Sequence, residues 1–400
     1  MLLRFAFLLF SLVFSLSLTK VDELNIPPQT TFEVTMNTDR YFTIISSKFT
    51  ARFSLENNHV NRIGAAKSKQ LPIFGSPCTI EDHSFYLLGQ TGNQLSSKIY
   101  ELAEEGSYIR DVSNTKSLSF PTRIKTPYFN NGSHCFYSGG SLVRGGQLSD
   151  VLAWNKQRAK TLSESFVAGS EHSIAVKDDL LMAFSNSKKI TILNIKTGEQ
   201  STKVIEGYQA GVSQKALIYG DNILVLSEVG SKIHLNVIDK DMKVTETQEL
   251  SFGETGPIKA VFINNENYEP HILVCRQNCV VYRVSDKEPT QNCEDGTFFG
   301  IAPGGDMMSC VECKPGYNCH GGKLRECTLN SFQRFKGATV CQICFGKVVK
   351  DKDGHHIGCS MTSYKMPALL AISTMIFSVV AVLATNLFKR KSVPMSKSFI

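Results

Sequence analysis

The sequence lacks a complete motif for any common catalytic chemistry. It contains no H-E-x-x-H, no G-x-S-x-G, no P-loop and no G-x-G-x-x-G. These absences exclude the usual signatures of zinc proteases, serine hydrolases and nucleotide-binding enzymes. The nine histidines are dispersed, and His134 and His234 stand in strand-like stretches, where packed or exposed side chains are typical. We therefore expect no enzymatic activity, no catalytic or metal-binding residue and no cofactor.

Basic stripes are also missing. The formal net charge is +7, but part of the excess lies in the last residues of the chain. A nucleic-acid-binding surface needs lysines and arginines gathered on one face or along one element. We expect no nucleic-acid partner.

Long hydrophobic runs are restricted to the two ends. The later run, Met366 to Phe388, has 23 residues and no charged side chain. At about 1.5 Å of rise per residue it is long enough to cross a hydrocarbon core of about 30 Å. Lys389, Arg390 and Lys391 follow directly, as in a stop-transfer signal that favours the cytosolic side. The pattern predicts one transmembrane α-helix within residues 363–388 and a cytosolic tail of residues 389–400.

The first run, Met1 to Ser17, has the layout of a secretory signal peptide. Arg4 precedes an apolar stretch, and Ser15 and Ser17 provide the small residues of a cleavage site. We predict a signal peptide over residues 1–17, cleaved just after Ser17, with an uncleaved anchor as the alternative. Both runs together predict a type I single-pass protein of the plasma membrane, with the lipid bilayer as a partner. A secretory-pathway membrane is the alternative location.

No stretch of residues 30–290 shows a 3.6-residue apolar period. Pairs of short β-rich runs, broken by Gly, Asn and Ser, recur there instead, and such runs are typical of β-hairpins. The six pairs are 41–45 with 51–55, 84–88 with 99–102, 135–137 with 151–154, 180–184 with 190–195, 223–226 with 233–238, and 272–275 with 279–284. Their spacing of about 40 to 50 residues is the period of propeller blades.

These hairpins predict a mainly β fold, with an approximately six-bladed β-propeller ectodomain over residues 18–290. We expect residues 31–36 to be the strand that closes the ring. Two-sheet sandwiches are the alternative. The single tryptophan, Trp154, excludes the sialidase type, whose repeated boxes each contain one. Residues 135–140 and 150–155 resemble a kelch repeat, and residues 192–199 resemble the end of a WD-type blade.

Cysteines are scarce before residue 290 and dense after it. Eight of the twelve lie in the last part of the chain: Cys293, Cys310, Cys313, Cys319, Cys327, Cys341, Cys344 and Cys359. Apolar runs are scarce there, so a fold needs covalent cross-links. Two C-x2-C pairs with His320 and His355 or His356 would also suit zinc, but an oxidising compartment favours disulfides. We predict a small disulfide-rich module over residues 291–362.

The remaining cysteines and one sequon add local expectations. Asn131-Gly-Ser is the only N-x-Ser/Thr sequence, which makes Asn131 a candidate glycosylation site. Cys78 and Cys135 are candidates for one bridge. Cys275 and Cys279 flank a hairpin turn, where a bridge would fix the strand register.

The cysteine-rich segment resembles the ephrin-receptor-like repeat, which is akin to the modules of the tumour-necrosis-factor receptors. Residues 296–299, 310–322 and 332–344 carry the likeness, with Cys-Val-Glu-Cys-Lys-Pro-Gly-Tyr as its clearest run. No kinase domain follows. The resemblance implies an elongated stalk. It also suggests sequential pairing of the cysteines, as Cys293–Cys310, Cys313–Cys319, Cys327–Cys341 and Cys344–Cys359.

These features favour a binding role outside the cell. We expect loops on one propeller face to take a protein or glycan ligand, in adhesion or as a receptor. A cargo or sorting receptor of the secretory pathway is one alternative. A membrane-anchored enzyme with its site in the propeller channel is the other.

Overall fold

The chain divides into two compact units in a computed structural model. The first comprises Met1–Asn292 and Phe299–Val311, and the second comprises Cys293–Phe298 and Glu312–Ile400. The structure describes residues 16–27, 32–38, 40–46, 49–67, 78–81, 84–91, 94–102, 109–111, 118–120, 128–130, 135–143, 146–154, 159–166, 173–184, 187–252, 256–286, 292–302, 304–351, 354–360 and 375–383. Between residues 78 and 166 it describes the backbone alone.

Among the described residues of the first unit, six sheets of mostly antiparallel strands follow one another along the chain. The first sheet consists of β2 (Phe32–Thr38), β3 (Tyr41–Ser46), β4 (Phe49–Glu56) and β5 (His59–Lys67). The second consists of β6 (Cys78–Glu81), β7 (Ser84–Thr91), β8 (Gln94–Leu102), β9 (Ile109–Asp111) and β10 (Leu118–Phe120). The third consists of β11 (Tyr128–Asn130), β12 (Cys135–Val143), β13 (Gly146–Trp154) and β14 (Ala159–Phe166). Each sheet is open, and most neighbouring strands are consecutive in the chain.

The next three sheets repeat this pattern with two additions. The fourth sheet consists of β15 (Ser173–Lys177), β16 (Leu180–Phe184), β17 (Lys189–Asn194) and β18 (Gln200–Val204). The fifth contains β19 (Gln214–Tyr219), β20 (Asn222–Val229), β21 (Lys232–Ile238) and β22 (Val244–Leu250). The sixth contains β23 (Lys259–Asn264), β24 (Pro270–Cys275) and β25 (Cys279–Asp286). The fifth sheet also holds β26 (Thr297–Ile301) and β27 (Met307–Glu312), and the sixth holds β1 (Leu16–Leu24).

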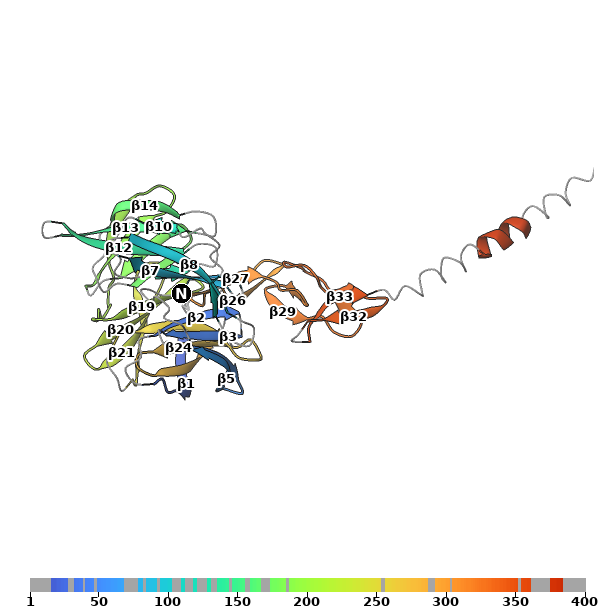
Figure 1. Ribbon diagram of the computed structural model, residues 1–400, viewed down its shortest axis with the longest axis horizontal. Coiled ribbons are helices and arrows are strands. Elements are labelled where there is room, and N and C mark those ends of the chain that lie inside the picture. The colour runs from blue at the N-terminus through green and yellow to red at the C-terminus, as the bar shows by residue number, and fades with distance from the viewer. Residues whose placement is uncertain are drawn as a thin grey trace, which may run out of the picture. The chain divides into compact units, whose positions relative to one another are not determined.

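The first strands of the six sheets form a ring. β2 contacts β6, β6 contacts β11, β11 contacts β15, β15 contacts β19, β19 contacts β23, and β23 contacts β2 again. Such a ring of sheets, each with four or more strands, is a propeller-like arrangement, which leaves only short edges. Figure 1 shows β19, β20 and β21 side by side in the fifth sheet. The predicted mainly β, propeller-like architecture is confirmed.

The six predicted hairpins are the second and third strands of the six sheets. They correspond to β3–β4, β7–β8, β12–β13, β16–β17, β20–β21 and β24–β25. The described members of these pairs are largely buried, because both faces of a blade are covered by its neighbours. β20, for example, has buried side chains at Ile223, Leu224, Val225 and Leu226 in succession. Opposite faces of that strand pack into two different apolar clusters.

The closing strand is not the predicted one. Residues 32–38 form β2, the first strand of the first sheet, whereas β1 pairs antiparallel with β25 and completes the last sheet. The register runs from Leu16 opposite Asp286 to Leu24 opposite Cys279. β1 is stabilised beside β25 because Leu16 and Leu18 are buried in the apolar cluster that contains Val284. The N-terminal and C-terminal parts of the ring are therefore joined by backbone hydrogen bonds.

The second unit consists of short hairpins held by disulfides. β28 (Tyr317–His320) pairs with β29 (Lys323–Glu326), β30 (Ser331–Phe332) with β31 (Gln342–Ile343), and β32 (Lys347–Lys350) with β33 (His356–Ser360). Disulfides join Cys313 to Cys319, Cys327 to Cys341 and Cys344 to Cys359. Six large apolar side chains among the described residues from 312 to 360 are exposed, including Leu329 and Phe345. Cross-links thus take the place of an extensive apolar core.

Four predictions fall wholly or partly outside the described residues. Asn131 and residues 1–15 lie outside them, as do the side chains of Cys78 and Cys135. Of the predicted transmembrane segment, only residues 375–383 are described, and they are helical. Within the described part of the chain, no helix has both the length and the apolar character needed to span a bilayer.

Candidate functional site

The hairpin formed by β26 and β27 lies on the inner side of the ring of first strands, next to β19. β27 pairs in parallel with β19, with Ile218 opposite Met307 and Tyr219 opposite Met308. The turn before β27 forms a bridge between Gly304 and Met36 of β2. The Gly305 carbonyl accepts a hydrogen bond from the Phe262 amide of β23 at 2.6 Å. The hairpin therefore contacts β2, β19 and β23, the first strands of three sheets. In a propeller, a ligand bound in the central channel would contact these same strands.

This hairpin differs from the expectation for the cysteine-rich segment. The cysteine-rich stalk is expected over residues 291–362, whereas Phe299–Val311 belongs to the first unit. The apolar side chains of the hairpin explain why it belongs to the first unit. The Phe299 ring packs edge-on against Tyr219 with centroids 5.3 Å apart, and Ile301 and Met308 join the apolar cluster of the fifth and sixth sheets.

An ion pair fixes the turn of the hairpin. Lys215 Nζ lies 2.8 Å from Asp306 Oδ1, and the side chains are 14% and 3% exposed. The Asp306 carbonyl also accepts a hydrogen bond from the Ile218 amide at 3.0 Å. Side chain and backbone of one residue thus hold the hairpin to β19.

Gly305 makes this close approach possible. Its φ is +80°, and an added Cβ would lie 2.9 Å from Met36 Cβ and 3.0 Å from the Phe262 carbonyl oxygen. We expect Gly305→Ala to destabilise the head by about 2–4 kcal/mol, because left-handed strain and overpacking add. Gly198 has a similar φ of +77° and nothing within 4 Å of an added Cβ, so Gly198→Ala reports the strain alone. Urea unfolding of both variants measures the difference, and equal losses would show that the hairpin is not tightly seated.

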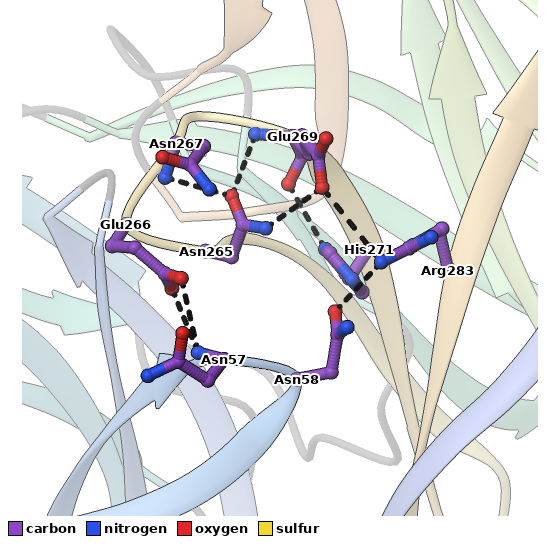
Figure 2. Close-up of polar contacts among 8 residues, drawn as sticks. All are labelled: Asn57, Asn58, Asn265, Glu266, Asn267, Glu269, His271 and Arg283. Carbon is purple, nitrogen blue, oxygen red and sulfur yellow. Dashed lines mark hydrogen bonds and ion pairs between the residues drawn. The ribbon is translucent and has the colours of Figure 1, made fainter.

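A polar loop cluster lies where the first and sixth sheets meet. Its members are Asn57 and Asn58 of the β4–β5 turn, Asn265, Glu266, Asn267 and Glu269 of the β23–β24 turn, His271 of β24 and Arg283 of β25 (Figure 2). Both Asn57 and Asn58 have positive φ, at 51° and 62°. Two such residues in succession are typical of a two-residue hairpin turn, and asparagine tolerates that backbone well.

Asn265 organises the longer turn. Its Oδ1 accepts hydrogen bonds from the amides of Asn267 and Glu269, each at 2.9 Å, and its Nδ2 donates to Glu269 Oε2 at 2.9 Å. Asn265 is only 3% exposed. An asparagine that bonds the backbone two residues on stabilises a turn locally. The β23–β24 turn therefore has a defined shape before any ligand binds.

Contacts between the two turns make them one surface. The Asn57 amide donates to both carboxylate oxygens of Glu266 at 3.0 Å (Figure 2). Arg283 donates to Asn58 Oδ1 at 3.1 Å and lies 3.9 Å from Glu269 Oε2. These bonds hold the exposed Asn267 and Glu269 beside the first sheet. The Arg40 guanidinium makes a cation–π contact with Tyr268, with Cζ 5.8 Å from the centroid of the ring.

His271 lies beneath this surface. The residue is fully buried, and its Nδ1 lies 2.9 Å from the Glu269 carbonyl oxygen, while Nε2 has no hydrogen-bond partner among the described residues. Burial lowers the pKa of His271, and the neighbouring Arg283 adds to the effect, although the Glu269 carbonyl opposes it. A neutral imidazole with its proton on Nδ1 fits these contacts.

The lowered pKa of His271 predicts a loss of stability in acid. Because the folded pKa is below the ordinary value, the unfolded chain takes up a proton first as the pH falls below about 6.5. Stability is therefore complete above that pH and declines as the pH approaches the folded pKa. We expect the melting temperature to fall between about pH 7.5 and pH 5.5 in the unmodified chain, and to fall less in His271→Gln. His59→Gln, at a side chain that is 75% exposed, is the control for removal of a histidine. An unchanged pH dependence in His271→Gln would contradict the assignment.

The polar loop cluster can offer amide, carboxylate, guanidinium and aromatic groups to a ligand. These groups suit hydroxyl-rich or peptide partners, which exchange hydrogen bonds with planar polar side chains. No group of three metal-binding side chains occurs among the described residues. The cluster was missed from the sequence, although Asn-Glu-Asn-Tyr-Glu between two strands is a visible turn signal.

The predicted cysteines are placed as follows. Cys313–Cys319, Cys327–Cys341 and Cys344–Cys359 coincide with the sequential scheme. Cys293 and Cys310 are each disulfide-bonded. Cys275 and Cys279 are joined across their hairpin turn. No cysteine whose side chain the structure describes is free, so the thiols that a zinc site would need are absent from that part of the chain.

Comparisons with known proteins show likeness in solved structures alone. No family model and no curated protein matches the chain. The WD40 domain of Neurospora crassa Pan2 has a TM-score of 0.44 at 10% identity, covering 68% of this chain and 97% of that one. BamB from Moraxella catarrhalis has 0.31 at 13%, covering 62% and 70%. The PQQ-bound aldose sugar dehydrogenase from Streptomyces coelicolor has 0.45 at 9%, covering 68% and 99%.

Proposed function

We propose that this chain is a type I single-pass membrane protein whose six-bladed propeller head binds a protein or glycan partner outside the cell. The ephrin-receptor-like module is its stalk, and the apolar run at residues 366–388 is its membrane anchor. The role is that of a non-enzymatic receptor or adhesion protein.

The observation that carries the proposal is the pairing of described cysteines, as in Cys275–Cys279, Cys313–Cys319, Cys327–Cys341 and Cys344–Cys359. Bridges of this density form and persist in the secretory pathway and outside the cell, where thiols are oxidised. Three of them lie within the segment just before the apolar run. A folded, cross-linked module on the N-terminal side of the run supports the orientation that Lys389, Arg390 and Lys391 also favour.

The polar loop cluster supports binding rather than catalysis. It is formed by loops on a rigid scaffold, and such loops commonly carry recognition. The channel is a less suitable site because the chain's own hairpin contacts β2, β19 and β23 from inside. A sorting receptor of the secretory pathway shares the topology and differs in location. A channel enzyme is the other alternative, and the hairpin gives it less room.

Topology is tested with the full chain in cultured cells. One epitope is inserted at the exposed turn around Gly230, where an added side chain meets nothing within 4 Å, and a second follows Ile400. Antibodies applied to intact cells should label the first epitope and leave the second unlabelled until the cells are permeabilised. Labelling of the C-terminal epitope on intact cells would contradict the orientation. Label confined to internal membranes would favour the sorting receptor.

Binding is tested on an array of glycans and on cells, with the purified full chain as probe. We expect Asn267→Lys to lower binding at least about tenfold, because a bulky cation then stands in the proposed contact surface. Gln277→Lys is the matched control, since Gln277 is an exposed residue in the turn at the other end of β24. Equal loss in both variants, or loss in neither, would exclude the polar loop cluster as the binding surface.

A further inference from the structure

The closing strand β1 begins inside the predicted signal peptide. Leu16 and Ser17 pair with Asp286 and Ser285 of β25. A cut after Ser17, as the sequence analysis predicts, would remove two residues from the strand.

Leu16 contributes to both the core and the strand edge. Its side chain is completely buried, in the apolar cluster that also contains Leu18, Leu250 and Val284. A leucine lost from such a cluster leaves its neighbours without packing partners. The head therefore needs Leu16.

The outer edge of β1 is covered by side chains of β22. The Leu16 amide donates to Glu246 Oε2 at 3.0 Å, and the Leu18 amide donates to Gln248 Oε1 at 2.9 Å. Gln248 Nε2 in turn donates to the Leu18 carbonyl at 2.8 Å. The neutral amide of Gln248 thus both accepts and donates, whereas the carboxylate of Glu246 accepts from the backbone nitrogen of Leu16.

A carboxylate beside the Leu16 nitrogen would suit a free chain terminus at that residue. If the bond before Leu16 is cut, the Leu16 nitrogen becomes an ammonium group at the position that now lies 3.0 Å from Glu246. Charge-assisted hydrogen bonds of this kind are stronger than those of a neutral amide. A cut after Ser17 would instead place the ammonium beside the neutral Gln248 and leave Glu246 without this donor.

We propose that the signal peptide is removed between Ser15 and Leu16, and that the new Leu16 ammonium pairs with Glu246. Ser15 supplies the small residue before the cut, with Val13 two residues earlier. Signal peptidase hydrolyses the peptide bond with one water: Ser15 leaves as a carboxylate and Leu16 gains an amine, which takes up a proton. The inference rests on the proposed passage through the secretory pathway.

The direct test is N-terminal sequencing of the full chain purified from secreting eukaryotic cells. Leu16 as the first residue supports the proposal. Leu18, or any other start after a cut, overturns it. A chain that retains Met1 overturns the proposal and also contradicts the signal peptide on which the proposed function depends, so the two failures are distinguishable.

The ion pair is tested separately with two forms of the chain. A replacement signal peptide is used to leave either Leu16 itself or two extra residues before it as the terminus. We expect Glu246→Gln to lower the melting temperature by about 3 °C when Leu16 is the terminus, and by less than half as much in the extended form. Glu249→Gln is the matched control on the same strand, since Glu249 pairs with Lys232 at an exposed position. An equal effect of Glu246→Gln in both forms would overturn the pairing with a free terminus.

Discussion

Asp306→Ala is expected to destabilise the head by about 3 kcal/mol, because it leaves the Lys215 ammonium largely buried without its carboxylate. The pair has 2.8 Å between Nζ and Oδ1, and neither side chain is more than 14% exposed. In addition, the turn would lose one of its attachments to β19, although the backbone bond from Ile218 remains. Equilibrium unfolding in urea of the full chain in detergent measures the loss.

Asp179→Ala is the matched control for this experiment. Asp179 also pairs with a lysine, at 2.7 Å from Lys196, but these side chains are 46% and 74% exposed. Exposed ion pairs contribute at most about 1 kcal/mol. If Asp306→Ala costs no more than Asp179→Ala, the hairpin is not held inside the ring as described.

Removal of the Cys327–Cys341 bridge is expected to have the second large effect. The two residues are 14 apart in sequence, and a cross-link over that length restricts the unfolded chain by about 3 kcal/mol. The surrounding unit has few buried apolar side chains to compensate. We expect Cys327→Ser with Cys341→Ser to unfold the module at 37 °C, so that most of the protein is retained inside the cell. Surface labelling with a membrane-impermeant biotin reagent measures the exported fraction.

The double substitution is used because it leaves no unpaired thiol. A matched comparison is Cys275→Ser with Cys279→Ser, which opens a much shorter loop in a strand pair that already has extensive apolar packing. We expect the second pair of substitutions to preserve more surface protein. Equal export of the unmodified chain and the Cys327–Cys341 variant would contradict a stalk that depends on its bridges.

The middle strands of each sheet could be predicted from the sequence, and the outer ones could not. β20 and β24 are rich in buried branched residues, which gives a clear strand signal. β18, in contrast, is exposed at all five residues, and β22 alternates with a single buried residue, Leu250. Strands at the rim of a blade have little apolar surface to cover, so their sequences resemble those of loops.

Two segments pair with strands of the first unit although the sequence places them, wholly or in part, in other regions. The signal peptide predicted over residues 1–17 includes Leu16 and Ser17 of β1, because a leucine is equally suited to a hydrophobic run and to a buried strand. β27 was read as stalk, because it lies between cysteines and next to Gly304 and Gly305. Its parallel pairing with β19 joins residues far apart in the chain, and such a contact cannot be predicted from the local sequence pattern of either strand.

The polar loop cluster was missed because its residues belong to three separate segments. Asn57 and Glu266 meet only after the first and sixth sheets close the ring. The β23–β24 turn alone could have been recognised as a turn from Asn265 and the polar residues after it. Its role as a shared surface follows from the fold.

The measurement that tests the account most directly is a non-reducing peptide map of the full chain, purified from cells after its free thiols have been alkylated. We expect linked peptides that join Cys313 to Cys319, Cys327 to Cys341 and Cys344 to Cys359, with none of the six alkylated. Alkylated cysteines throughout this segment would contradict the disulfide-bonded module, and with it the location of the head outside the cell.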